Sequence, residues 1–353
     1  MGHRIGKRAS LSRAEFRRCL ATLASVALAV GACGGSSPSA PATDSAVGAG
    51  ATRVTANPTV ASPKVAPSVS PLPSLALRWK STGPESATPS FQPLAVDPTT
   101  GDVWASVPFA NLFWIFSADG TFLESWGTSG AGPGQFDLND HLQNPDGFGA
   151  IAFAPDGSFY VGDVGNHRIE KFDVARRFVK AWGTFGSDAG QFAQITAVAT
   201  DGKVVYVGDG RGQIQAFDST GAYLRTFGAD GGFSAFVAID LSGNAYATNP
   251  SVGAPAVAKF DPQGGEIARF DMSSIGDAVG VAVDPRGRIF VGAASTKPPF
   301  GPLGTYELSP DGRLLHGWSN GGGGYLALST KGDTLYISGW TWPYIEAYAI
   351  PEG

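Results

Sequence analysis

The chain is poor in cysteine, histidine and charge. Its 353 residues include two Cys and four His, and 16% of them are charged. Both cysteines, Cys19 and Cys33, lie near the amino terminus, so a disulfide framework is excluded for the rest of the chain. No Ser, His and Asp follow one another in a turn suited to nucleophilic attack. The histidines are scattered along the chain: His3, His141, His167 and His316.

A sustained helical period is also missing. The chain is instead rich in turn formers and aromatics, with 49 Gly, 25 Pro, 22 Phe and 8 Trp. After residue 75, apolar and polar residues alternate over stretches of four to eight. Short strands joined by tight turns have this composition. The sequence therefore predicts an all-β domain over residues 75–353.

The balance of charge disfavours nucleic acid as a partner. The whole chain has 25 basic and 30 acidic residues, and residues 1–32 hold six of the basic residues and one of the acidic ones. Removing these leaves 19 basic against 29 acidic residues. A phosphate-binding surface needs the opposite sign.

The amino-terminal segment has the pattern of an export signal. A basic start precedes an apolar run over 20–30, which is too short to span a bilayer comfortably. The residues Val30-Gly31-Ala32-Cys33 resemble the lipobox of bacterial lipoproteins. This resemblance implies lipidation of Cys33 and anchoring to the outer face of the cell membrane. The alternative is an ordinary secretory signal and a secreted protein, and Arg17-Arg18 leaves a twin-arginine route open.

Residues 33–74 form a distinct segment. They are mainly Ser, Pro, Ala, Thr, Val and Gly, with almost no charge and no large aromatic residue. Such a composition does not bury enough apolar surface to offset the loss of chain entropy. We expect a disordered tether between signal and domain.

Six repeats organise the domain. In each repeat, a short strand leads into a turn, and a second strand with a central aromatic or apolar residue follows the turn. The turns are anchored on Asp97, Ala154, Thr200, Asp240, Asp284 and Ser329, which lie 57, 46, 40, 44 and 45 residues apart. A period near 40–45 residues with four strands per unit is typical of β-propeller blades. We expect a six-bladed β-propeller of four-stranded antiparallel blades.

The fourth strands predict how the ring closes. Five blades have a fourth strand ending in an aromatic residue, but the last repeat stops at Ile350 without one. A matching segment, Leu75-Ala76-Leu77-Arg78-Trp79, precedes the first repeat. We expect it to pair with the C-terminal blade as its outer strand, which leaves no open end to the ring.

The second repeat carries a family resemblance. Gly134-Gln135-Phe136 and the residues Asp163, Asn166, His167 and Arg168 resemble an NHL repeat. The third repeat keeps Gly190-Gln191-Phe192 and Asp209 but has Gly212-Gln213 where Asn-His-Arg is expected. The resemblance implies a propeller over 75–353, whereas the motif itself covers only about 130–228.

The polar corner of the second repeat has two interpretations. Asp163 and Asn166 can satisfy backbone donors in a tight turn, and Arg168 can pair with Asp163 or a neighbouring blade. Alternatively, these side chains form the polar half of a binding site. That candidate set is Asp163, Asn166, His167 and Arg168, with Arg211 from the third repeat.

The residues just before each inner strand carry no charge and no His, from Gln92-Pro93 in the first repeat to Gly324-Tyr325 in the last. Propeller metal centres need converging carboxylates, Asn or His at this position. We therefore expect no metal, no cofactor and no catalytic residue. The insertion at 136–147 contains several Asp and Asn, but its spacing fits no calcium loop, and a polar surface loop is expected.

Aromatic residues form a second candidate set. Loops of repeats five, six and one become neighbours once the ring closes, and they contain Phe300, Trp340, Trp342, Tyr344 and Phe109. On one face they would form an aromatic arc suited to sugar rings or peptide anchors. The alternative is that Phe113, Trp114 and Tyr344 fill the space between blades.

Three functions follow from these patterns. The first is a lipid-anchored, monomeric propeller that binds a protein, peptide or glycan of the cell envelope. The second is a metal-dependent propeller enzyme such as a lactonase, hydrolase or lyase. The third, RNA binding, is opposed by the export signal and the acidic charge. Because a fold does not determine a function, we expect the binding module as the default.

Overall fold

The computed structural model describes residues 74–84, 93–139, 149–210, 212–228, 236–249, 256–273, 275–294, 303–319, 324–338 and 344–352. All of them belong to one compact unit, Thr59–Gly353. In these ranges the chain forms strands and one short 3-10 helix, η1 (Pro108–Ala110). Within the same ranges, no helix has the length and apolarity needed to cross a membrane. The all-β prediction is confirmed.

Six antiparallel four-stranded sheets make up the unit. Each of the first five follows the chain from its inner to its outer strand. Blade 1 contains β2 (Leu94–Val96), β3 (Val103–Val107), β4 (Leu112–Phe116) and β5 (Phe122–Trp126). Blade 2 contains β8 (Ile151–Phe153), β9 (Phe159–Asp163), β10 (Arg168–Phe172) and β11 (Phe178–Trp182). Blade 3 contains β12 (Ala197–Thr200), β13 (Val204–Gly208), β14 (Gln213–Asp218) and β15 (Tyr223–Gly228).

The second half repeats this plan. Blade 4 contains β16 (Val237–Ile239), β17 (Ala245–Asn249), β18 (Ala256–Phe260) and β19 (Glu266–Asp271). Blade 5 contains β20 (Asp277–Val283), β21 (Ile289–Ala294), β22 (Leu303–Leu308) and β23 (Leu314–Trp318). Blade 6 contains β24 (Tyr325–Leu328), β25 (Thr334–Ser338), β26 (Ile345–Ala349) and, from the other end of the domain, β1 (Ala76–Ser81).

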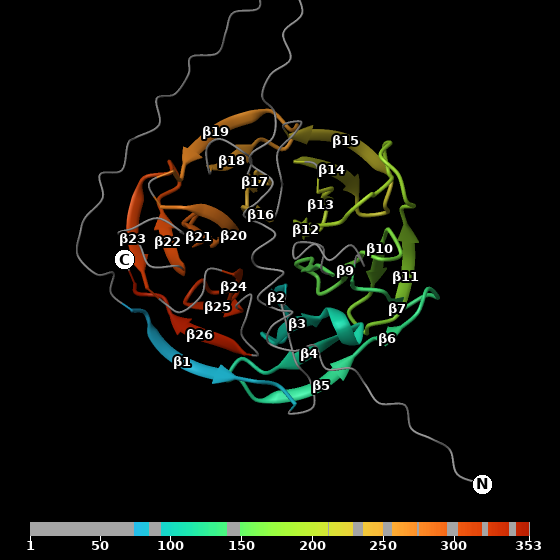
Figure 1. The fold of residues 1–353 in the computed structure, drawn as a ribbon, viewed down its shortest axis with the longest axis horizontal. Coiled ribbons are helices and arrows are strands. Elements are labelled where there is room, and N and C mark those ends of the chain that lie inside the picture. The colour runs from blue at the N-terminus through green and yellow to red at the C-terminus, as the bar shows by residue number, and fades with distance from the viewer. Residues whose placement is uncertain are drawn as a thin grey trace, which may run out of the picture. The chain divides into compact units, whose positions relative to one another are not determined.

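The blades form a ring (Figure 1). Each inner strand contacts the inner strands of both neighbouring blades, including β2 against β24. Because consecutive strands are antiparallel, the start of every inner strand and every connection between second and third strands lie on one side of the ring. We call this side the loop face. The turns between first and second strands, and between third and fourth, lie on the opposite side, the turn face.

The predicted closure of the ring is confirmed. Strand β1 pairs antiparallel with β26, from Ala76 opposite Ala349 to Ser81 opposite Ile345. Trp79 in β1 packs against the apolar layer between blades 6 and 1. Its indole Nε1 donates a hydrogen bond to the Ala118 carbonyl of blade 1, at 2.9 Å. The first and last parts of the domain are thus joined by a strand ladder and by side-chain packing.

Apolar layers hold neighbouring blades together. Each of the six layers combines side chains from two successive blades. In each blade, the second strand supplies a large aromatic side chain to the layer that faces the next blade. These side chains are Trp104, Tyr160, Tyr206, Tyr246, Phe290 and Tyr336. The fourth strands add a second aromatic side chain to the same layers: Trp126, Trp182, Phe227, Phe270, Trp318 and Trp79. Trp79 therefore occupies the position that the sixth blade otherwise lacks.

One parallel pair lies outside the blades. Strands β6 (Thr128–Ser129) and β7 (Gln135–Phe136) pair in the connection from blade 1 to blade 2. The inner strand of blade 5 also differs from the sequence-based expectation, because β20 begins at Asp277 rather than near Gly280. A register shift between Ala278 and Gly280 accommodates the extra residues. An acidic residue therefore lies at the loop-face end of this strand.

Candidate functional site

The ring encloses a cavity at the loop-face end of its axis. Its volume is about 70 Å³, and all six blades contribute to its lining. Six aliphatic side chains, one from each inner strand at the same register position, line it: Leu94, Ile151, Val198, Val237, Val281 and Leu326. The other lining residues lie nearer the loop face: Pro93, Ala150, Thr196, Ala197, Phe236 and Tyr325.

Two aromatic rings stand beside this opening. Phe236 of blade 4 and Tyr325 of blade 6 approach edge to face, with ring centroids 4.9 Å apart and planes at 79°. Edge-to-face contacts are the favoured geometry of aromatic pairs. The contact spans blade 5, which supplies Val281 to the same cavity. The mouth is therefore bordered by aromatic surface on one side.

Hydrogen bonding engages part of the polar backbone around the cavity. The carbonyl oxygens of Pro93, Ala150 and Phe236 each accept an N–H from the second strand of their own blade, at 2.8–3.1 Å. The side-chain polar atoms of the lining are the hydroxyls of Thr196 and Tyr325. None of the lining residues is an acid, a base or a histidine. This environment favours an uncharged, apolar group.

Metal-ligating side chains do not gather elsewhere in the described part of the chain. Across its ranges, no three His, Cys, Asp or Glu side chains lie close enough to hold an ion. The insertion 136–147, considered above for calcium, is described only up to residue 139.

The predicted polar corner is built around one buried carboxylate. Asp163, at the end of β9, is fully buried and accepts the Asn166 amide and the Arg168 Nε, both at 2.8 Å. It also accepts the backbone N–H of Asp137, at 2.6 Å. The pKa of Asp163 is raised by burial, and these hydrogen bonds oppose the rise. The architectural roles predicted for Asp163 and Arg168 are confirmed, whereas Asn166 donates to a backbone carbonyl and, among the described residues, does not accept from a backbone donor.

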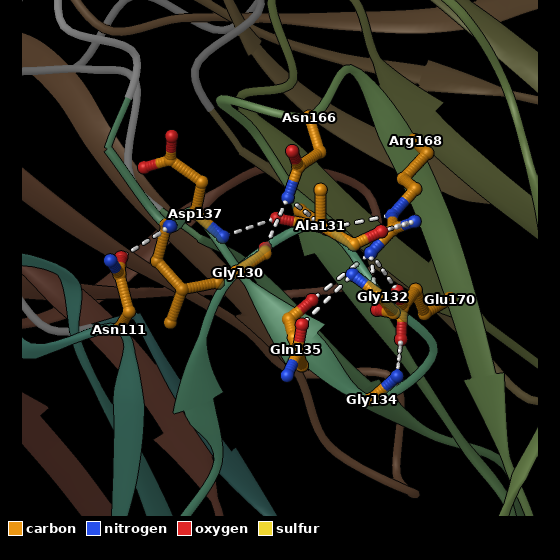
Figure 2. Close-up of polar contacts among 12 residues, drawn as sticks. Asn111, Gly130, Ala131, Gly132, Gly134, Gln135, Asp137, Asn166, Arg168 and Glu170 are labelled. Atoms are coloured by element: carbon orange, nitrogen blue, oxygen red, sulfur yellow. Dashed lines mark hydrogen bonds and ion pairs between the residues drawn. The ribbon is translucent and has the colours of Figure 1, made fainter.

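Arg168 and Asn166 reach across to the connection between blades 1 and 2 (Figure 2). The Arg168 guanidinium donates to the carbonyls of Ala131, Gly132 and Gln135, at 2.8–3.0 Å. Asn166 donates from the same amide nitrogen to the Gly130 carbonyl, at 2.9 Å. These bonds hold residues 130–135 against blade 2. We refer to residues 130–135 with their side-chain partners as the clamp.

Glu170 completes the clamp. This β10 residue is fully buried, forms a close ion pair with Arg168 and accepts the Gly134 N–H at 2.9 Å. Burial raises the pKa of Glu170 to about 7, and the neighbouring Asp163 contributes in the same direction. In blade 3 the same position is Gln215, whose amide oxygen accepts the Gly190 N–H at 2.8 Å. Both blades thus use the same hydrogen bond from a glycine N–H. The acceptor is an acidic side chain in blade 2 and a neutral amide in blade 3.

The first blade holds the same connection just before and just after residues 130–135. Asn111, which has a positive φ of 55°, donates to the Ser129 hydroxyl and accepts the Leu138 N–H, both at 2.8 Å. Polar side chains of blades 1 and 2 therefore fix the described part of this connection.

His167 differs from its neighbours in the corner. Its φ is 55°, and its ring lies edge to face with Phe185 at a centroid distance of 4.9 Å. Phe185 is 70% exposed and belongs to the connection between β11 and β12, on the loop face. A ligand role for Asp163, Asn166, His167 and Arg168 stays a prediction. Arg211 lies outside the described residues.

The aromatic arc is described only in part. Phe109, in η1 on the loop face, is 65% exposed. Tyr344 is half-buried, with the Lys80 ammonium 3.1 Å from its ring centroid at the β1–β26 junction. The alternative that Phe113 and Trp114 pack between blades is confirmed, since both are buried in inter-blade layers. Phe300, Trp340, Trp342 and the lipidation candidate Cys33 lie outside the described residues.

Two features of the site were not predicted from the sequence. One is Glu170, whose role depends on a glycine N–H more than thirty residues earlier. The other is the aliphatic lining of the cavity. The sequence contains a pattern that could have predicted it, because an aliphatic residue followed by Ala recurs in all six inner strands. The alanines are Ala95, Ala152, Ala199, Ala238, Ala282 and Ala327.

Comparison with known proteins supports the architecture. A scan against protein-family models finds no match, and a search of curated protein sequences finds none either. Among solved structures, the chain is similar to hydrazine synthase of Kuenenia stuttgartiensis, with a TM-score of 0.51 and 13% identity. The alignment covers 76% of this chain and 99% of that chain. At this level of identity the likeness concerns the fold alone, and the chain is a six-bladed β-propeller.

Proposed function

We propose that the protein is a lipid-anchored, extracytoplasmic binding module of the cell envelope. Its ligand, a protein, peptide or glycan, meets the loop face of the propeller. The lipobox-like sequence before Cys33 and the segment 33–74, which has almost no charge and no large aromatic residue, support the anchor and its tether. The NHL-like motif of repeats two and three supports an interaction role.

One observation carries the proposal. The axial cavity lies toward the loop face, and its wall combines six aliphatic side chains with the Phe236–Tyr325 pair. Exposed Phe109 and Phe185 lie on the same face. Concave apolar surfaces bordered by aromatic residues are favoured for ligand and partner binding. An acid-base or metal mechanism would need ionisable groups in the cavity, and its lining supplies none with a charge.

Site-specific photo-cross-linking in intact cells tests this proposal. A benzophenone amino acid replaces Phe109 or Phe185 in the full-length chain. We expect covalent adducts from these loop-face positions. The matched control is Leu241, which is 84% exposed in the turn between β16 and β17 on the turn face. Adducts from Leu241 alone, or adducts from none of the three positions, would contradict the proposal.

The same cells test the anchor. The protein is expected in the membrane pellet, and the Cys33→Ser chain in the soluble envelope fraction. Equal partition of both chains would remove the lipid anchor from the proposal and leave the binding role to be decided by the cross-links.

A further inference from the structure

We infer that the axial cavity binds one aliphatic side chain, of the size of Leu, Ile or Val, presented by a peptide or protein. This inference rests on the proposed function and narrows its ligand from protein, peptide or glycan to a polypeptide with an exposed aliphatic residue.

The size of the cavity fits a side chain. A single water molecule needs roughly 10–15 Å³ of this kind of volume. The 70 Å³ of the cavity therefore accommodate roughly five to seven water-sized groups. The four carbons of a leucine side chain fit within that space, whereas a complete sugar ring with its hydroxyls is larger than it. A fragment of a larger molecule, inserted from the loop face, is the occupant that fits.

The chemistry of the wall selects an apolar fragment. The ring of Leu94, Val281 and their four equivalents offers only carbon atoms as side-chain contacts. The Pro93, Ala150 and Phe236 carbonyls are already engaged by second-strand N–H groups. A sugar hydroxyl or a carboxylate placed against these six side chains would lose hydrogen bonds to water and find no replacement among them, which is costly. An aliphatic side chain loses none and gains the burial of its surface.

The border of the cavity suits a polypeptide. The inserted side chain leaves its backbone outside the cavity, near the Phe236–Tyr325 pair. Anchors that fill a small central pocket dominate many protein interfaces, while the surrounding contacts exclude water. A small pocket with six aliphatic side chains in its wall and an aromatic pair beside it is therefore suited to one anchor residue.

Selection from a phage-displayed library of random dodecapeptides tests the inference. The target is the immobilised full-length protein. We expect the selected peptides to share one aliphatic residue at a fixed position. In synthetic peptides, replacing that residue with Ala or Asp is expected to raise Kd at least about tenfold, as the loss of a buried aliphatic group requires.

Two variants of the protein place this binding in the cavity. Val281→Phe and Ala150→Leu enlarge side chains of the lining and fill the space. Each is expected to weaken the best peptide at least about tenfold while keeping a cooperative thermal transition. The matched control is Val174→Phe, at a 61% exposed position in a turn on the turn face, which is expected to bind the peptide like the wild type.

The outcomes separate this inference from the proposed function. Peptides without a shared aliphatic residue, or peptides that bind both filled variants like the wild type, overturn the inference. If loop-face cross-links still form in that case, the binding module stands and only the aliphatic anchor falls. A selection that enriches nothing overturns the inference as well.

Discussion

Gly120 illustrates how single residues hold this ring closed. It lies in the turn between β4 and β5 with a φ of 89°, and a Cβ placed there would approach the Trp79 ring to 2.5 Å. Gly221, Gly264 and Gly312 occupy the same turn in blades 3 to 5, each against the fourth-strand aromatic of the preceding blade. The small residue is required because an aromatic ring from the adjacent blade rests on the turn.

Gly120→Ala is therefore expected to lower the free energy of unfolding by more than Gly101→Ala. Both glycines have positive φ, but a Cβ at Gly101 comes no closer than 4.0 Å to a neighbour. The two variants share the backbone strain of about 1 kcal/mol. Displacing Trp79 adds roughly 1–3 kcal/mol to Gly120→Ala alone. Urea denaturation of the full chain measures both, and equal losses would show that Trp79 does not rest on this turn.

At the scale of elements, the clamp joins two blades through a buried charge. The folded-state pKa of Glu170, about 7, lies above the ordinary value of 4.5. Between these pH values the native state binds more protons than the unfolded state, so this residue's contribution to stability is full below pH 4.5 and is lost as the pH rises through 7. The groups that face Glu170 are the Arg168 guanidinium, the Asp163 carboxylate and the Gly134 N–H.

Glu170→Gln tests this linkage. The amide keeps an acceptor for the Gly134 N–H, as Gln215 does in blade 3. We expect the variant to gain stability relative to the wild type as the pH rises from 4.5 to 8, by on the order of 1–3 kcal/mol. Chemical denaturation at several pH values measures the difference. The exposed Glu124→Gln is the control, and the same pH trend in both variants would assign the linkage to another group.

The strands and their order could be predicted from the sequence because the patterns that specify them are local. The repeat of strand, turn and aromatic predicted six blades, and the unmatched copy ending in Trp79 predicted the closing strand. The sequence left two interpretations of the corner at Asp163 open, because the partners of this corner at 130–137 lie far away in sequence. Glu170 was missed because nothing local distinguishes a buried acid on a strand from an exposed one. The early start of β20 at Asp277 depends on a register shift that alternation alone does not reveal.

The closed ring is a property of the whole molecule, and β1 is the element on which it depends. Deleting residues 75–81 removes a five-pair ladder with β26, the Trp79 packing and the Lys80–Glu346 ion pair. It also exposes β26 as an unprotected edge. We expect a large fall in Tm in calorimetry. Deleting residues 34–70 is expected to leave Tm nearly unchanged, because that Ser-, Pro- and Ala-rich composition does not support a packed core. Equal effects of the two deletions would mean that stability does not depend on the closing strand.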